Sequence, residues 1–297
     1  WNTTLTLSHN KNSVKALTGE AVQLYEAKFG FNQNTHRIAV GEPLGQFYGY
    51  ITEGLYQVDD FNYDASTQTY TLKDGVPYHG DKGQIRPGMW KFKNLTGDDN
   101  VIDENDKTVI GNAQPKFYGG LNNSFTYKGF DLSIFLTFSY GNEVLNATKL
   151  VTSKVGSLNY NALDVMNSSN RWMTINSDGQ KVTDPGELAA LNVGKTVAAY
   201  HDAQQGDNYI HSWAVEDASY LKLSNVTLGY TFPKNLIARV GLKNLRLYAT
   251  GNNLLTWTKY SGFDPEVSTM KSGLTPGVDF GAYPLSRSFI FGLNVAF

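Results

Sequence analysis

The sequence predicts an all-β fold that forms part of a large antiparallel transmembrane β-barrel, with long extracellular loops and short periplasmic turns. Three observations predict it. Apolar side chains recur at every second residue over several long stretches, which is the period of a strand with one apolar face. The later stretches are joined by alternately long and short connections, as in outer-membrane barrels. The last stretch is such a strand and carries a terminal phenylalanine.

The composition argues against several other classes of protein. Of the 297 residues, 41% are hydrophobic and 18% are charged, which does not suit a disordered chain. Abundant glycine, tyrosine and phenylalanine favour strands and turns over helices. The net charge of −2 gives no general attraction to nucleic acid, and the absence of cysteine excludes disulfides. No apolar run approaches the roughly 20 residues of a membrane-spanning helix.

The first 115 residues predict few long strands. Residues 1–8 alternate apolar with polar side chains and predict a strand. Residues 13–43 predict an irregular connection with one short strand near 22–29. The aromatic and glycine-rich residues 45–56 predict a further strand. Residues 57–115 are polar and punctuated by glycine and proline, and therefore predict a long loop.

Residues 117–127 and 130–140 form the clearest predicted hairpin, with a tight turn at Lys128-Gly129. The second of these strands is apolar at every position on one face and mostly polar on the other. Tilted strands of this length are long enough to cross a hydrocarbon core.

Two more long strands are predicted in the last third of the chain. Residues 142–217 predict a second long loop, with a helical turn near 185–191. Residues 220–232 predict a strand whose phase slips at Ser224-Asn225, which a β-bulge explains. A short connection then leads to the strand 245–257, and residues 258–282 predict a third long loop.

The last strand has a predicted outward face and a predicted inward face. Ser288, Asn294 and Ala296 are expected to point inward. The outward side chains are apolar and comprise Phe289, Phe291, Leu293, Val295 and Phe297.

The connections orient the predicted barrel. A periplasmic C-terminus places the two short connections on the periplasmic side and the three long loops outside. About seven strands are counted, and the first and last are both expected to run inward. All 297 residues are therefore interpreted as part of one barrel domain whose plug and N-terminal strands are missing from this chain. The alternative is a soluble β-sandwich in which the apolar faces share a core.

Six motifs occur in order along nearly the whole chain: GEPLGQFYGYITEGLY at 41–56, IGNAQPKFYGG at 110–120, YKGFDLS at 127–133, SYLKLSNVTLGYTFP at 219–233, GNNLLTWTKYSGFDPE at 251–266 and YPLSR at 283–287. Together they resemble the C-terminal third of the SusC/RagA family of TonB-linked outer-membrane proteins. The resemblance implies a barrel of about 22 strands in the outer membrane of a Gram-negative bacterium of the Bacteroidetes type. It also implies that the terminal aromatic strand is an assembly signal.

The same resemblance implies partners and an activity. The activity is import of oligosaccharides or peptides across the lipid bilayer. The implied partners are the TonB complex, which acts through a plug region outside this chain, and a SusD-like surface lipoprotein that acts as a lid. Two alternatives remain: a passive porin or surface adhesin, and a soluble carbohydrate-binding β-sandwich. No nucleic-acid partner is predicted.

The acidic residues 94–106 form one candidate site. Many members of the family carry a calcium-like D-x-N-G-D-G-x-I-D pattern here, in which alternate oxygens converge on one cation. This chain departs from the pattern, because Asp99 replaces a glycine and one residue is extra. A solvated acidic turn is the alternative to a calcium site. The predicted Ca²⁺ ligands are Asp98, Asn100, Asp103 and Asp106.

Loop aromatics form the second candidate site, in which rings stack on a sugar or clamp a peptide. Packing or anchoring at the membrane interface is the alternative for each ring. The residues are Tyr160, Trp172, Tyr209 and Trp213. The five histidines show no metal-binding spacing, and neither G-x-S-x-G nor a phosphate-binding loop occurs, so no enzymatic activity is predicted.

Overall fold

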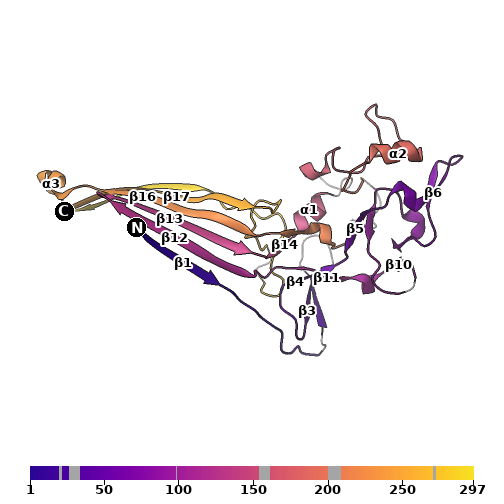
Figure 1. Ribbon diagram of the computed structural model, residues 1–297, viewed down its shortest axis with the longest axis horizontal. Helices are drawn as coiled ribbons and strands as arrows, with labels where there is room; N and C mark the ends of the chain where they lie inside the picture. The colour runs from indigo at the N-terminus through magenta and orange to yellow at the C-terminus, as the bar shows by residue number, and fades with distance from the viewer. Residues whose placement is uncertain (20–21, 27–33, 98, 154–160, 200–208, 270–271) are drawn as a thin grey trace.

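The computed structural model consists of a long antiparallel sheet and a unit of short strands and helices at one end of it (Figure 1). It describes residues 1–19, 22–26, 34–97, 99–153, 161–199, 209–269 and 272–297. The sheet has six strands, in the order β1 (Asn2–Ser8), β12 (Phe117–Tyr127), β13 (Phe130–Tyr140), β16 (Tyr220–Thr231), β17 (Asn244–Thr258) and β19 (Ser288–Ala296).

The register across this sheet confirms the long predicted strands. One row of partners crosses all six strands: Thr3, Asn123, Ile134, Val226, Gly251 and Phe289. The predicted bulge is also present, because the pairing of β16 with both of its neighbours skips Ser224. The slip keeps the apolar residues on one face on both sides of the bulge.

The direction of the first strand corrects one prediction. Six antiparallel strands alternate in direction, so β1 and β19 run opposite ways, and the expectation that both run inward is wrong. Figure 1 shows the N-terminus at the same end of the sheet as the C-terminus. The count of about seven was too high because the strands expected near 22–29 and 45–56 lie outside this sheet.

One face of the sheet is apolar and exposed. The predicted outward residues of β19 lie on it, with Phe291 80% exposed and Leu293 61% exposed. Other exposed residues on the same face are Leu5, Leu7, Phe117, Phe125, Phe130, Tyr140, Leu221, Leu228, Leu247 and Trp257. An apolar surface of this extent suits lipid and not water. The described residues place no second sheet over it, so the shared core of a β-sandwich is not formed.

The opposite face is polar, and hydrogen bonds between side chains connect its strands, in one case across an intervening strand. Asn225 donates to Asn252 at 2.8 Å, and Asn252 donates to Ser288 at 3.0 Å. Near the periplasmic end, Arg246 donates to both carboxylate oxygens of Asp131, at 3.0 and 2.6 Å. Side chains that satisfy one another in this way stay on the inner face of a barrel wall.

The short connections lie at one end of the sheet, as predicted (Figure 1). Lys128 and Gly129 have φ of 46° and 87°, the left-handed pair that a two-residue hairpin turn requires. The connection between β16 and β17 holds the short helix α3 (Lys234–Ile237).

The long connections form a folded outer unit at the other end of the sheet (Figure 1). Its strands are β2 (Val22–Glu26), β3 (Asn34–Ala39), β4 (Gln46–Gly49), β5 (Thr52–Leu55), β6 (Phe61–Asp64), β7 (Thr69–Leu72), β8 (Tyr78–His79), β9 (Trp90–Phe92), β10 (Val101–Ile102), β11 (Thr108–Asn112), β14 (Glu143–Asn146), β15 (Val215–Asp217) and β18 (Val278–Asp279). Its helices are α1 (Ala147–Thr152) and α2 (Pro185–Leu191).

The outer unit corrects the prediction of long loops for residues 57–115 and 142–217. Strands of two to five residues are too short to show a period, so their pairing comes from contacts between distant segments. The strand predicted over 45–56 is divided into β4 and β5. The helical turn near 185–191 is confirmed as α2, and the short strand near 22–29 is confirmed as β2, with 27–29 outside the described residues.

The core of the outer unit joins all three long connections. Phe47, Leu145, Ile210 and Val278 are each at most 1% exposed and belong to one apolar cluster. A second cluster contains Trp90, Phe92 and Trp172. These segments therefore pack as one body over the end of the sheet. In the described ranges, no helix has the length and apolar character needed to cross a membrane.

Candidate functional site

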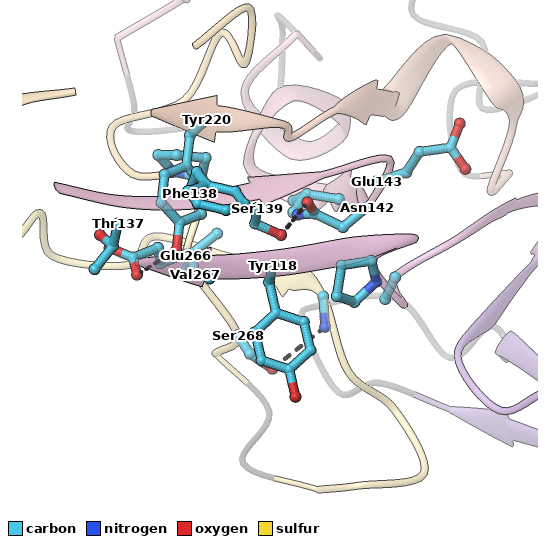
Figure 2. Close-up of a pocket in the computed structure, with 16 residues that line it drawn as sticks. Tyr118, Thr137, Phe138, Ser139, Asn142, Glu143, Tyr220, Glu266, Val267 and Ser268 are labelled. Carbon is cyan, nitrogen blue, oxygen red and sulfur yellow. Dashed lines mark hydrogen bonds between the residues drawn. The ribbon is translucent and has the colours of Figure 1, made fainter. Parts of the chain in front are cut away.

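A pocket of about 500 Å³ lies where the polar face of the sheet meets the outer unit (Figure 2). The outer ends of β12, β13 and β16 supply Tyr118, Ser139 and Tyr220. The segment between β17 and β18 supplies Glu266 and closes the opposite side. The pocket thus joins one strand-borne wall to one loop-borne wall.

Glu266 fixes this loop against the sheet. Its carboxylate forms an ion pair with the ammonium of Lys222 and accepts a hydrogen bond of 2.8 Å from the hydroxyl of Tyr220. Lys222 is only 5% exposed, and a charge that is buried to this degree requires a partner. The ion pair therefore determines where the loop lies.

The other polar groups of the pocket are partly engaged with the protein. Ser139 donates to Asn142 Oδ1 at 2.7 Å, and Asn142 Nδ2 donates to the carbonyl of Ala218 at 3.2 Å. One oxygen of Glu143 accepts from the backbone N–H of Asn112 at 2.7 Å. The ring of Tyr118 is 44% exposed. This arrangement offers hydrogen-bond acceptors and an aromatic face to a neutral polar ligand.

Of the predicted loop aromatics, the three that the structure describes, Trp172, Tyr209 and Trp213, do not line this pocket. Tyr160 lies outside the described residues. Trp172 is 1% exposed and packs directly on Gly88, whose φ is 86° and where an added Cβ would overlap the indole ring. Its indole is therefore packed in the core of the outer unit, and a role of Trp172 in ligand binding stays a prediction.

Tyr209 and Trp213 are half-buried in a cluster of rings. The Tyr209 ring meets the edge of Tyr50 at a centroid distance of 5.2 Å. Trp213 lies 4.9 Å from Trp90, and the ammonium of Lys149 lies 4.0 Å from the Trp213 ring centroid. Packing fixes the position of both rings, and their role in ligand binding stays a prediction.

Sequence reasoning missed the pair of Lys222 and Glu266. Lys222 was visible in the sequence, because it is the one charged residue of the predicted strand 220–232. No spacing pointed to Glu266, which lies 44 residues away along the chain.

Two histidines are buried in the outer unit, and burial favours their neutral form. His211 is 1% exposed, and burial lowers its pKa to about 3, with further lowering from Lys149 and His79. His36 is 0% exposed, and burial lowers its pKa to about 4, although a hydrogen bond with the carbonyl of Pro276 opposes this shift.

The acidic segment is organised around Asp106. One carboxylate oxygen accepts from the N–H groups of Leu95 and Thr96, at 2.6 and 2.9 Å, and the other accepts from the N–H of Asp103 at 2.8 Å. Burial acts to raise the pKa of Asp106, but these hydrogen bonds outweigh it and hold the pKa below its usual range. Asp106 thus serves as the internal brace of this turn.

The structure does not gather the other predicted calcium ligands that it describes into one group of side chains. Asp98 lies outside the described residues, and Asp103 caps a short turn by accepting from the N–H of Asn105 at 2.7 Å. The carbonyl of Asn100 accepts from the N–H of Tyr78. In the part of the chain that the structure describes, no group of three histidine or acidic side chains is placed to hold a metal. Calcium binding stays a prediction.

Replacing Asp106 with asparagine is expected to loosen this turn. The amide keeps one acceptor but turns N–H donors toward backbone N–H groups, which costs about 1–3 kcal/mol of local stability. Limited proteolysis of the segment measures the effect, with Asp99→Asn as control because Asp99 accepts only locally, from the N–H of Val101. Equal cleavage of both variants would contradict the expectation. Adding Ca²⁺ to the wild type tests the metal, since unchanged protection would refute it.

Comparisons with known proteins show strong similarity over the whole chain. No family model matches it. It is 33% identical over 304 residues to TonB-dependent receptor P3 of Formosa agariphila, covering 100% of this chain and 27% of the relative. It is 27% identical over 308 residues to TonB-dependent receptor SusC of Bacteroides thetaiotaomicron, covering 100% of this chain and 24% of the relative. The chain spans about a quarter of these relatives.

Solved structures show the same fold. The structure of the RagAB peptide transporter matches with a TM-score of 0.64 at 20% identity, over 99% of this chain and 26% of that chain. The RagAB peptide importer in the closed-closed state matches with a TM-score of 0.64 at 19% identity, over 99% of this chain and 27% of that chain. The alternating strands and exposed apolar face described above therefore belong to a known barrel architecture.

Proposed function

We propose that this chain, a SusC/RagA-like C-terminal barrel segment, contributes wall strands and outer loops to a TonB-dependent importer of nutrient oligomers. The observation that carries the proposal is the sheet with two faces. One face is apolar and exposed, and the other is polar and leads to a pocket beneath the outer unit. The names of the relatives, which are receptors and a transporter, support the same reading.

The proposed importer works in the outer membrane of a Gram-negative bacterium of the Bacteroidetes type. Its remaining strands and plug complete the barrel, and TonB supplies energy through the plug. A SusD-like lipoprotein covers the outer unit, whose packed apolar clusters support the surface that this partner contacts. The pocket suits peptides or oligosaccharides, because both present hydroxyl or amide donors to Glu143 and Glu266.

The experiment measures uptake of labelled oligopeptides and oligosaccharides by cells that produce the full-length protein. Uptake is expected to require TonB and to fall in a Glu266→Gln variant, which weakens the ion pair that fixes the loop. Glu53→Gln, an exposed change in the outer unit, serves as control. Uptake without TonB would instead favour a passive porin, and surface attachment without uptake would favour an adhesin.

The terminal strand is proposed to act in assembly. Deleting Phe297, which is 80% exposed, is expected to lower membrane insertion because the terminal ring forms part of the recognised strand. Heat-modifiable migration on a gel measures the folded fraction. Phe263→Ala removes an equally exposed ring (81%) from an outer loop and should leave insertion unchanged. Normal insertion after deletion of Phe297 would refute the role.

A further inference from the structure

A second pocket, of about 410 Å³, lies in the outer unit away from the sheet. Residues 68–70, at the end of the β6–β7 turn and the start of β7, form one side, and Arg86-Pro87 form another. Residues 181–183 and Leu188 of α2 complete it. Figure 1 shows β6 and α2 at the extreme of the molecule farthest from the sheet. The pocket therefore lies in the part of the outer unit that is farthest from the sheet.

The floor and wall of this pocket are apolar and fixed. Val182 and Leu188 are 8% and 3% exposed, and Pro87 is buried beside them. Tyr70 forms the wall, and its hydroxyl donates to the carbonyl of Thr183 at 2.8 Å, so the hairpin and the α2 segment are tied together. A preformed apolar floor of this kind holds the body of a ligand.

The rim of the pocket is cationic. Arg86 and Lys181 are both exposed, and no aspartate or glutamate lines the pocket. Within the described ranges, neither side chain forms an ion pair. One terminal nitrogen of Arg86 donates to the carbonyls of Gly83 and Ile85, at 2.7 and 2.8 Å, which holds the guanidinium at the rim.

We propose that this pocket binds a carboxylate carried by a nutrient oligomer. The planar guanidinium of Arg86 matches a carboxylate, Lys181 adds a second cation, and the apolar floor takes the adjoining part of the ligand. A free inorganic anion would leave the floor unused. The inference rests on the proposed import function and deepens it by naming a group that the substrate carries. A peptide C-terminus and a uronate sugar both present this group.

The test measures binding to the purified full-length protein in detergent. The probes are an apolar tripeptide with a free C-terminal carboxylate, the same tripeptide as its C-terminal amide, a uronate trisaccharide, and its methyl ester. At least one acid is expected to bind about tenfold more tightly than its neutral counterpart, because a charge-assisted pair is lost in the latter. The pair that shows this preference identifies the source of the carboxylate.

A matched pair of double variants locates the effect. Arg86→Gln with Lys181→Gln should abolish the preference for the acid. Lys234→Gln with Arg239→Gln removes the same two kinds of charge near α3, at the opposite end of the molecule, and should preserve it. Heat-modifiable migration confirms that each variant folds. If the first pair does not fold, Lys181→Gln alone replaces it, with Lys234→Gln as control.

Two outcomes would overturn the proposal. Either neither acid is preferred over its neutral counterpart, or the preference survives in the Arg86 and Lys181 variant. Uptake is scored separately. Carboxylate-selective binding without TonB-dependent uptake would sink the import function and leave this site standing, whereas uptake without such binding would sink the site alone.

Discussion

Ile134→Arg is expected to block stable insertion of the barrel. Ile134 lies in the middle of β13, paired with Asn123 and Val226, and it shares the apolar face with Leu132 and Leu136. An arginine that faces the middle of a bilayer costs about 2–4 kcal/mol. Urea unfolding of the full-length protein in lipid vesicles measures this loss, and heat-modifiable migration reports the fraction that folds.

The neighbouring change Ser133→Arg provides the control. Ser133 lies on the polar face, paired with Ser124 and Thr227, where an arginine reaches water and other polar groups. Its insertion should stay close to that of the wild type. An equal loss in both variants would show that the two faces of β13 have been assigned wrongly.

Acidification is expected to destabilise the outer unit before it affects the sheet. His36 and His211 have folded-state pKa values of about 4 and about 3, below the ordinary value of 6.5. Between each folded-state pKa and 6.5, the unfolded chain binds more protons than the folded one. The free energy of unfolding is therefore full above pH 6.5 and falls as the pH drops below it. At about pH 5, each histidine lowers the free energy of unfolding by about 2 kcal/mol relative to neutral pH.

Urea unfolding followed by tryptophan fluorescence measures this effect, because Trp90, Trp172 and Trp213 lie in the outer unit. His36→Gln and His211→Gln should each lower the free energy of unfolding at neutral pH. Each should also reduce the slope of that free energy against pH by the contribution of one proton. His9→Gln is the control, since His9 is exposed at the start of the first long connection. An unchanged slope in the double variant would contradict the assignment of the protons to these two residues.

The long strands were predictable from sequence because their pattern is long. Residues 117–127 and 130–140 have the predicted bounds, and the slip at Ser224 appears as the predicted bulge. Eleven residues of alternation, broken at few positions, leave little room for a helix or a loop. The lipid-facing side of the sheet follows from the same alternation.

The outer unit and the pocket were not predictable in this way. A strand such as β8 or β18 has two residues and no period, so it exists only because its partner is near. Whether Trp172 binds a ligand or fills a core depends on Gly88, which lies 84 positions earlier in a different connection. Lys222 was visible in the sequence, but its pairing with Glu266 depends on how the last long connection folds back onto the sheet.

The shared core of the outer unit also has a consequence for the order of folding. His36 meets the carbonyl of Pro276 across a separation of 240 residues, and Tyr50 donates its backbone N–H to Ile210. Contacts at such separations form slowly, because the chain between them must first be brought together. Within the described residues of the long sheet, only β12 with β13 and β16 with β17 pair across short connections, whereas β1 with β12 and β13 with β16 pair across long ones. The two hairpins therefore form first, and the rest of the sheet matures together with the outer unit because both depend on contacts between distant segments.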